Sequence, residues 1–191
     1  HSMKNFSIIT AIVVASLLYF PNEESLKVKF ENDFLIGATI NQEDYQIIDK
    51  DAKAIKIVQK DFNAVTPENS MKWMHIHPEF NEFTFSNADK IVDFAKENEM
   101  YLLGHTLVWH NQVSDYIYNI KDRVTFQKHI EKHINTVVKR YQGKVDMWDV
   151  VNEALNDDGT LRKTVFLDML GENYIEPVSY THLTLPTIIT V

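Results

Sequence analysis

The residue with the clearest potential for catalysis is a carboxylate at the end of a short apolar segment. Glu153 follows the apolar segment 145–151, with Asn152 beside it. A carboxyl group at the mouth of a buried strand can be desolvated, which raises its pKa and lets it act as a general acid near neutral pH. Asn152 offers both a donor and an acceptor to a nearby hydroxyl group. The alternative is that Glu153 only stabilises the N-terminus of a following helix.

A second polar group follows another short apolar segment. Residues 66–73 read TPENSMKW, so that Glu68, Asn69, Lys72 and the indole of Trp73 fall within six positions. These side chains can hydrogen-bond to sugar hydroxyls, and an indole can stack on the face of a sugar ring. The same residue types are also common in solvated loops, which is the alternative interpretation of this segment.

A third polar group ends the apolar segment that begins at Tyr101. Residues 104–112 read GHTLVWHNQ and contribute His105, Trp109, His110 and Gln112. An indole, an amide and two imidazoles directly after a strand suit the binding of a polar ligand. For His110 the alternative is a structural histidine in a core network.

The histidines do not predict a metal centre. His105 and His110 are five positions apart, which is not the i, i+4 spacing of a helical zinc site, and no carboxylate lies between them. His75 and His77 fall in a segment that we predict to be a polar loop, where their pairing is fortuitous. We therefore predict no metal site and no cofactor.

The polar groups must be positioned by alternating strands and helices. Short apolar segments predict buried strands at 34–39, 63–66, 101–108 and 145–151. Helical spacing of apolar residues predicts helices at 44–61, from the cap Ser86 or Asn87 onward, at 122–141 with Gly143 as its C-cap, and at 165–170.

Four strand–helix units in alternation predict a parallel α/β sheet, either doubly wound or part of a (β/α)8 TIM barrel. No glycine-rich phosphate loop follows any strand, which disfavours a nucleotide-binding protein. In a barrel, function resides at the carboxyl ends of the strands, which is where the three polar groups fall.

Composition excludes several other classes. The chain of 191 residues is long enough to bury a hydrophobic core without disulfides or metals. With 19 basic and 27 acidic residues its formal charge is −8, which argues against a nucleic-acid partner. The absence of cysteine excludes a disulfide scaffold, a zinc–thiolate site and a thiol nucleophile.

The two ends of the chain differ in composition from the middle. Residues 1–22 predict a tag remnant followed by a signal peptide, because Lys4 precedes the apolar stretch 8–20. The alternative for this stretch is a buried first helix or strand. That stretch is too short for a stable membrane span, so we expect a secreted or periplasmic protein. Residues 177–191 carry no charged side chain and two of the chain's five prolines are at or beyond this point. We predict an unrelated tail there, with an edge strand or a hydrophobic tail as alternatives.

The three polar segments together resemble glycoside hydrolase family 10, the endo-1,4-β-xylanases. The motifs TPENSMKW, GHTLVWHNQ and WDVVNEA carry the resemblance, which spans residues 34–175. It implies a partial (β/α)8 barrel of about four β/α units, a catalytic domain at 23–176, and xylan or xylo-oligosaccharides as partners.

The resemblance also implies a role for each site residue. Glu153 corresponds to the acid/base, and Asn152 to the residue that binds the 2-hydroxyl of the sugar next to the scissile bond. His105 and Trp109 correspond to residues that line the same subsite, and His110 to a supporting position. The positions that correspond to sugar-binding groups on the non-reducing side are Glu68, Asn69, Lys72 and Gln112.

One half of the expected catalytic pair is missing from the sequence. A retaining glycosidase needs a second carboxylate as nucleophile, and the family carries it on a later strand in a T-E-x-D context that this sequence lacks. None of the carboxylates after Glu153 ends a predicted strand; they are Asp157, Asp158, Asp168, Glu172 and Glu176. We therefore expect a truncated and inactive chain whose exposed strand edges promote self-association. The alternatives are a non-catalytic β-glycan-binding fragment and a β-1,4-glucanase of the same family.

Overall fold

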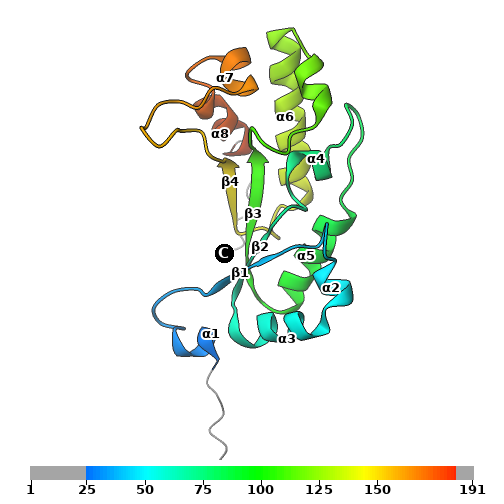
Figure 1. The fold of residues 1–191 in the computed structure, drawn as a ribbon, viewed down its shortest axis with the longest axis vertical. Helices are drawn as coiled ribbons and strands as arrows, with labels where there is room; N and C mark the ends of the chain where they lie inside the picture. The colour runs from blue at the N-terminus through cyan, green and yellow to red at the C-terminus, as the bar shows by residue number, and fades with distance from the viewer. Residues whose placement is uncertain (1–24, 184–191) are drawn as a thin grey trace, which may run out of the picture.

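A computed structural model describes residues 25–183 of the chain. Four parallel strands form one sheet in the order β1-β2-β3-β4 (Figure 1). They are β1 (Gly37–Ile40), β2 (Ala64–Pro67), β3 (Tyr101–Val108) and β4 (Met147–Val151). A doubly wound sheet reverses its strand order at a switch point, whereas here each strand pairs with the next one along the chain. The predicted partial (β/α)8 barrel is thereby confirmed over the doubly wound alternative.

Helices connect the strands and cover the sheet. The three longest are α3 (Ala52–Asp61), α5 (Ser86–Glu97) and α6 (Arg123–Arg140). The shorter ones are α1 (Leu26–Lys29), α2 (Ile47–Lys50), α4 (Trp73–Ile76), the 3-10 helix η1 (Asp115–Asn119), α7 (Val165–Leu170) and α8 (Ile175–Leu183). No helix of the described residues is long and apolar enough to cross a membrane.

The first β/α unit differs from its prediction in two respects. The strand begins at Gly37 rather than at Phe34, whose side chain is 57% exposed, so the predicted burial of this segment is wrong. The single helix predicted at 44–61 is two helices, because the Asp51 carboxylate accepts a 2.9 Å hydrogen bond from the backbone N–H of Ala54 and starts α3 there. The segment between β1 and α2, which includes the predicted helix start at Asp44, is a loop.

The later helices follow the sequence more closely. Asp122 caps α6 by accepting a 2.7 Å hydrogen bond from the backbone N–H of Thr125. The predicted C-cap at Gly143 is wrong, since α6 ends at the cap Tyr141 and Gly143 adopts its positive φ in the turn beyond. The predicted cap at Ser86 or Asn87 is wrong, because both residues lie inside α5, whose N-cap position is Phe85 and has no side-chain cap.

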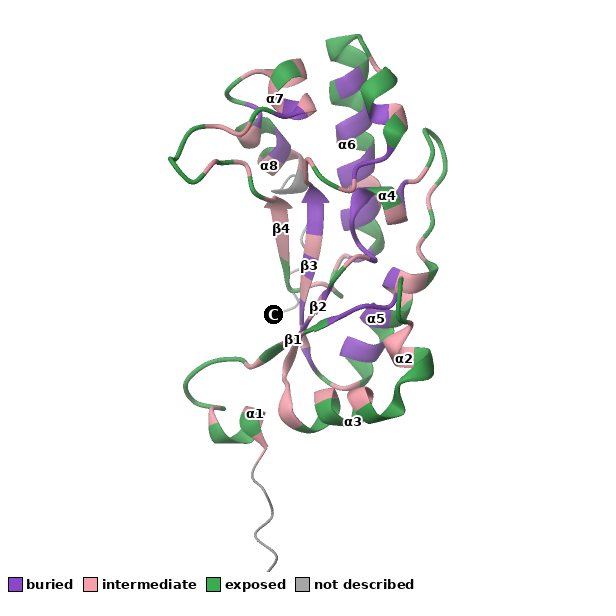
Figure 2. Cartoon of the chain, viewed as in Figure 1, coloured by how far each residue is buried: buried purple, intermediate pink, exposed green. Residues whose placement is uncertain are grey.

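The core lies between the sheet and helices α5 and α6 (Figure 2). Its apolar side chains come from both layers and include Ile91, Leu102, Leu107, Ile130 and Ile134. Strand β4 is less buried than predicted, with Met147 53% exposed, because it is an outer strand of the described sheet. The indole of Trp148 is half-buried and packs across Gly104 of β3, where a Cβ atom would lie only 2.3 Å from its Cε3.

The two ends of the chain are only partly described. The predicted leader at 1–22 lies outside the described residues. The predicted tail boundary at 177 falls inside α8, so the part of the tail up to Leu183 is helical rather than an edge strand. Val178 of this helix is 3% exposed, and α8 packs against α6 and β4.

Candidate active site

The residues predicted to form a site meet at the carboxyl ends of the strands. The polar segments after β2, β3 and β4 all begin where these strands end. The register brings Val108 opposite Val151, and the backbone N–H of Asn152 donates a 2.9 Å hydrogen bond to the carbonyl oxygen of Val108. Adjacent parallel strands therefore deliver Trp109 and Glu153 side by side.

Glu153 is held by the segment that follows β3. Its Oε2 accepts a 2.9 Å hydrogen bond from Nε1 of Trp109 and lies 3.9 Å from Nε2 of His110. Its backbone has a φ of 50°, and its carbonyl oxygen accepts a 3.1 Å hydrogen bond from Nε of Arg162. We expected a desolvated carboxyl group, but the Glu153 side chain is 48% exposed, because the described residues leave the open side of the strand end uncovered. An exposed and oriented carboxyl group remains accessible to a ligand.

Lys72 joins the segment after β2 to the indole of Trp109, which holds this carboxylate. Its Nζ lies 4.7 Å from the ring centroid of Trp109 and donates a 2.9 Å hydrogen bond to Oδ1 of Asn69. Burial lowers the pKa of Lys72, while the carboxylates of Glu68 and Glu153 raise it. The lysine is thus a buried cation that faces acidic groups and an aromatic ring, which suits a binding site for hydroxyl groups.

His105 is oriented by a carboxylate on the neighbouring strand. Its Nδ1 lies 3.0 Å from Oδ2 of Asp149 on β4. The hydroxyl group of Thr106 donates a 2.8 Å hydrogen bond to the carbonyl oxygen of Asp149, so that two residues of β3 contact Asp149. The imidazole of His105 is tilted against the indole of Trp109 at a centroid distance of 6.3 Å. Asp149 is a site residue that sequence reasoning passed over within the motif WDVVNEA.

His110 is not the core histidine of the alternative interpretation. Its imidazole packs edge-on against Trp109 at 5.8 Å and lies beside Glu153. Burial and the nearby Arg162 lower the pKa of His110, whereas Glu153 raises it. The position fits a residue that supports the carboxylate.

Two predicted sugar-binding residues lie at the margin of this group. The Glu68 side chain is exposed, and its backbone N–H donates a 2.9 Å hydrogen bond to the carbonyl oxygen of Ile40. Gln112 is turned toward His75 of α4, with 3.3 Å between its Oε1 and Nε2 of the histidine. The other nitrogen of His75 lies 3.8 Å from Oε2 of Glu43.

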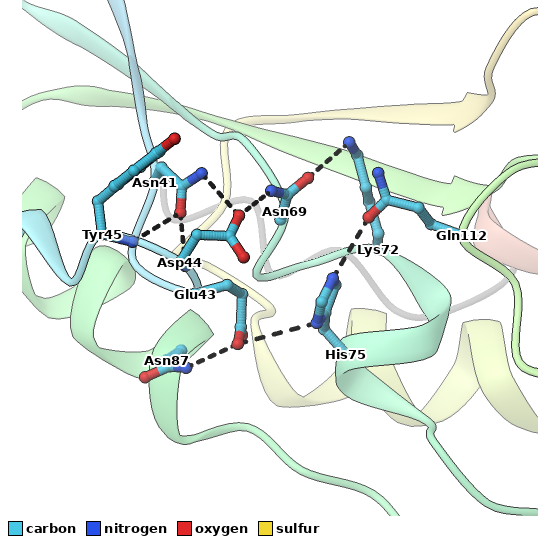
Figure 3. A network of polar contacts seen from close by, with 9 residues as sticks. All are labelled: Asn41, Glu43, Asp44, Tyr45, Asn69, Lys72, His75, Asn87 and Gln112. Carbon is cyan, nitrogen blue, oxygen red and sulfur yellow. Dashed lines mark hydrogen bonds and ion pairs between the residues drawn. The ribbon is translucent and has the colours of Figure 1, made fainter.

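The loop that follows β1 also belongs to the site. Figure 3 shows Asn41, Glu43 and Asp44 beside the side chains that we predicted to bind sugars. Oδ2 of Asp44 accepts hydrogen bonds of 3.0 Å from Asn41 and 2.9 Å from Asn69. Sequence reasoning missed this loop because it assigned Asp44 to a helix, where its carboxylate would have been one of many solvated charges.

His75 and His77 do not lie in a polar loop, as we predicted, because His75 belongs to α4 and His77 is its C-cap. His75 lies in the polar network of Figure 3. His77 is fully buried, stacks on Phe83 at 3.9 Å, and has its Nδ1 3.2 Å from Nδ1 of His133. The expectation of a solvated loop here was wrong, because the chain turns inward after α4 and packs on α6.

Among residues 25–183, no three histidine or acidic side chains come together in a way that could hold a metal ion.

The carboxylates after Glu153 lie in turns and helices of this region. Asp158 accepts a 3.0 Å hydrogen bond from the backbone N–H of Thr160, Asp168 lies in α7, and Glu176 is in the first turn of α8.

Comparison of the sequence with known proteins identifies a family that contains this site. Residues 25–181 match the sequence model of glycosyl hydrolase family 10. The endo-1,4-β-xylanase 3 of Hypocrea jecorina is 45% identical over 123 residues, which are 64% of this chain and 35% of the relative. The β-1,4-xylanase of Dictyoglomus thermophilum is 43% identical over 155 residues, which are 80% of this chain and 42% of the relative.

Solved structures agree with this result. The crystal structure of xylanase 10B from Thermotoga petrophila RKU-1 in complex with xylobiose has a TM-score of 0.77 and 39% identity. The match covers 83% of this chain and 49% of that one. The chain therefore spans half or less of the length of these relatives. Within that span, the chain belongs to glycosyl hydrolase family 10 and forms part of its (β/α)8 barrel.

Proposed function

We propose that this chain supplies the acid/base and the sugar-binding residues of the non-reducing side in an endo-1,4-β-xylanase. The observation that carries the proposal is the position of Glu153, whose exposed carboxyl group is oriented by Trp109 and lies beside His110. The named xylanases among the relatives support xylan as the substrate. The xylobiose bound by the Thermotoga petrophila enzyme supports xylo-oligosaccharides as ligands.

In the proposed reaction, Glu153 first donates its proton to the oxygen of the leaving sugar, as the bond from this oxygen to the sugar carbon breaks and a second carboxylate bonds to that carbon. Glu153 then removes a proton from a water molecule, which attacks the same carbon and releases the second product from the second carboxylate. Trp109 keeps Oε2 pointed toward the ligand side, and Lys72 with Asn69 holds the sugar on the non-reducing side. Asn152 and His105 complete the subsite next to the scissile bond.

A retaining mechanism also needs a nucleophilic carboxylate about 5–5.5 Å from the acid/base. We propose that none of the acidic residues of this chain fills that role and that a longer protein carries it on a later strand. The chain by itself is then a binding-competent and inactive fragment.

Two preparations test the proposal. The protein from the longer reading frame should release reducing ends from xylan, and Glu153→Gln should abolish this release. The 191-residue chain should release none, and yet bind xylohexaose by calorimetry. Hydrolysis by the short chain that disappears in Glu153→Gln would show that the nucleophile lies within it. A longer protein that is inactive on xylan would refute the enzyme assignment.

A non-catalytic glycan-binding fragment is the second candidate, and one observation favours it. Lys72, Asn69 and Trp109 form a connected group that needs no nucleophile to bind a sugar. A longer protein that binds xylohexaose without hydrolysing it would support this candidate. Activity of the longer protein on cellulose rather than xylan would instead support a β-1,4-glucanase.

We further propose that the chain is exported and self-associates. The lysine and apolar stretch within residues 1–22 support export, and a reporter fused to this segment should appear outside the cytoplasm. In the described sheet the outer edges of β1 and β4 pair with no strand, which supports association. A monomer by sedimentation at high concentration would contradict the second proposal.

A further inference from the structure

The loop that follows β1 ends in a chain of hydrogen bonds that reaches the sugar-binding lysine. We name residues 41–45 the β1 loop. We infer that Asp44 of this loop is a positioning residue that fixes the orientation of the Asn69 amide and, through it, of the Lys72 ammonium group for a xylo-oligosaccharide. This inference deepens the proposed function and rests on it.

The path of hydrogen bonds begins at the buried side-chain amide of Asn41. Asn41 is 3% exposed, and its Oδ1 accepts hydrogen bonds of 2.8 Å and 3.4 Å from the backbone N–H groups of Asp44 and Tyr45. A backbone N–H can only donate, so the oxygen of Asn41 must face these two groups, which fixes the position of the amide nitrogen. That nitrogen donates to Oδ2 of Asp44 at 3.0 Å. The Asp44 carboxylate is therefore held by the buried amide of its own loop.

The next step fixes the Asn69 amide. Its nitrogen donates a 2.9 Å hydrogen bond to Oδ2 of Asp44, and its oxygen accepts a 2.9 Å hydrogen bond from Nζ of Lys72. An ionised carboxylate only accepts and an ammonium group only donates, so only one of the two amide orientations satisfies both neighbours. The hydrogen bond from Asn41, together with that from Asn69, lowers the pKa of Asp44, so that the carboxylate is ionised near neutral pH.

The path of hydrogen bonds ends at Lys72, a lysine whose charge is costly to bury. Lys72 is 7% exposed, and burial lowers its pKa, while the carboxylates of Glu68, Glu153 and Asp44 raise it. One of its three N–H donors is used by Asn69, and Nζ lies 4.7 Å from the ring centroid of Trp109. A fixed ammonium group binds a hydroxyl group with less loss of side-chain entropy than a mobile one.

A second carboxylate supports the β1 loop without contacting Asn69. Asp49 of α2 also holds the β1 loop, because its Oδ2 accepts hydrogen bonds from Gln42 and from Lys90. Asp49 has no part in the path from Asn41 to Lys72. It is thus a matched carboxylate that supports the same loop without touching Asn69.

The experiment compares Asp44→Asn with Asp49→Asn in the full chain. We expect Asp44→Asn to weaken xylohexaose binding by about tenfold in calorimetry, since an interaction with a charged group is lost. In the same variant the Asn69 side-chain amide signals should shift in NMR spectra, because a neutral amide replaces the charged acceptor of its hydrogen bond. Asp49→Asn should change affinity less than about twofold and leave the Asn69 signals in place.

Each outcome decides a different claim. Unchanged Asn69 signals and affinity in Asp44→Asn would overturn the inference, as would an equal loss of affinity in both variants. If the parent chain binds no xylohexaose, the proposed function fails, but the Asn69 signals still report whether Asp44 orients the amide. Thermal unfolding of both variants identifies any loss of affinity that stems from a damaged fold.

Discussion

The indole Nε1 of Trp109 lies 2.9 Å from Oε2 of Glu153 and donates a hydrogen bond to it. The two residues are 44 positions apart. Trp109 directly follows β3, and Glu153 is the second residue after β4. The contact joins the third and fourth β/α units at the site. It also orients a carboxyl group that the described residues leave half exposed.

A double-mutant cycle measures this contact. Trp109→Phe and Glu153→Gln, made singly and together, should show a coupling energy of about 1 kcal/mol in the free energy of unfolding. The first change removes the hydrogen-bond donor, and the second removes the charge of the acceptor at a partly exposed site. Urea denaturation at pH 7 provides the values. A coupling energy within about 0.3 kcal/mol of zero would mean that the hydrogen bond does not hold in solution.

A second prediction concerns the packing of β3 on β4. Gly104→Ala should destabilise the chain by about 2 kcal/mol or more, because the new Cβ would lie 2.3 Å from a ring carbon of Trp148. Gly37→Ala in β1 is the matched control, since its Cβ would lie at an ordinary distance of 3.7 Å from the Cβ of Ala64. Urea denaturation of both variants should show a large loss for the first and a change of less than about 1 kcal/mol for the second. Equal losses would refute the packing argument.

The buried histidines predict a dependence of stability on pH. Burial lowers the pKa of His77 to about 4 and that of His133 well below its ordinary value. Between about pH 6.5 and pH 4 the unfolded chain binds protons that the folded chain does not, so stability falls as the pH falls. Each such histidine contributes a slope of about 1.4 kcal/mol per pH unit in that range.

The variant His133→Phe isolates this effect. Its unfolding free energy, measured in urea from pH 7 to pH 4, should fall less steeply with decreasing pH than that of the parent chain, because one buried titrating group is gone. Above about pH 7 the two curves should run parallel, since histidine is neutral in both states. The same slope in both proteins below pH 6.5 would exclude His133 as the source.

A fourth prediction concerns the contact between α5 and α6. The carboxylate of Asp89 accepts two hydrogen bonds from Arg140 and a 3.0 Å hydrogen bond from the Tyr141 hydroxyl group. Asp89→Asn should cost about 1–2 kcal/mol of stability, because the charged acceptor of three donors is lost from a half-buried position. Asp93→Asn, at an exposed position on the same helix, should change stability by less than about 0.5 kcal/mol in the same urea titration. A similar loss in both variants would assign the effect to helix charge instead.

The sequence by itself determined the order of the elements. Apolar segments predicted a strand at 101–108, which is β3, and a long helix at 122–141, close to the observed α6 (Arg123–Arg140). Hydrophobic periodicity is a local property that survives without tertiary contacts. The sequence also identified the three polar segments, since a cluster such as Glu153 with Asn152 directly after an apolar strand is visible in the linear chain. The resemblance of these segments to a known family was already contained in their residues.

Only the tertiary structure decided how those residues are arranged. Asp44 reaches Asn69 across 25 positions, and no linear pattern distinguishes that carboxylate from a solvated one. The exposure of Glu153 depends on what covers the strand end, and the burial of His77 depends on its packing against His133 of α6. These properties arise from contacts between distant segments, which form only when the sheet and its helices are assembled.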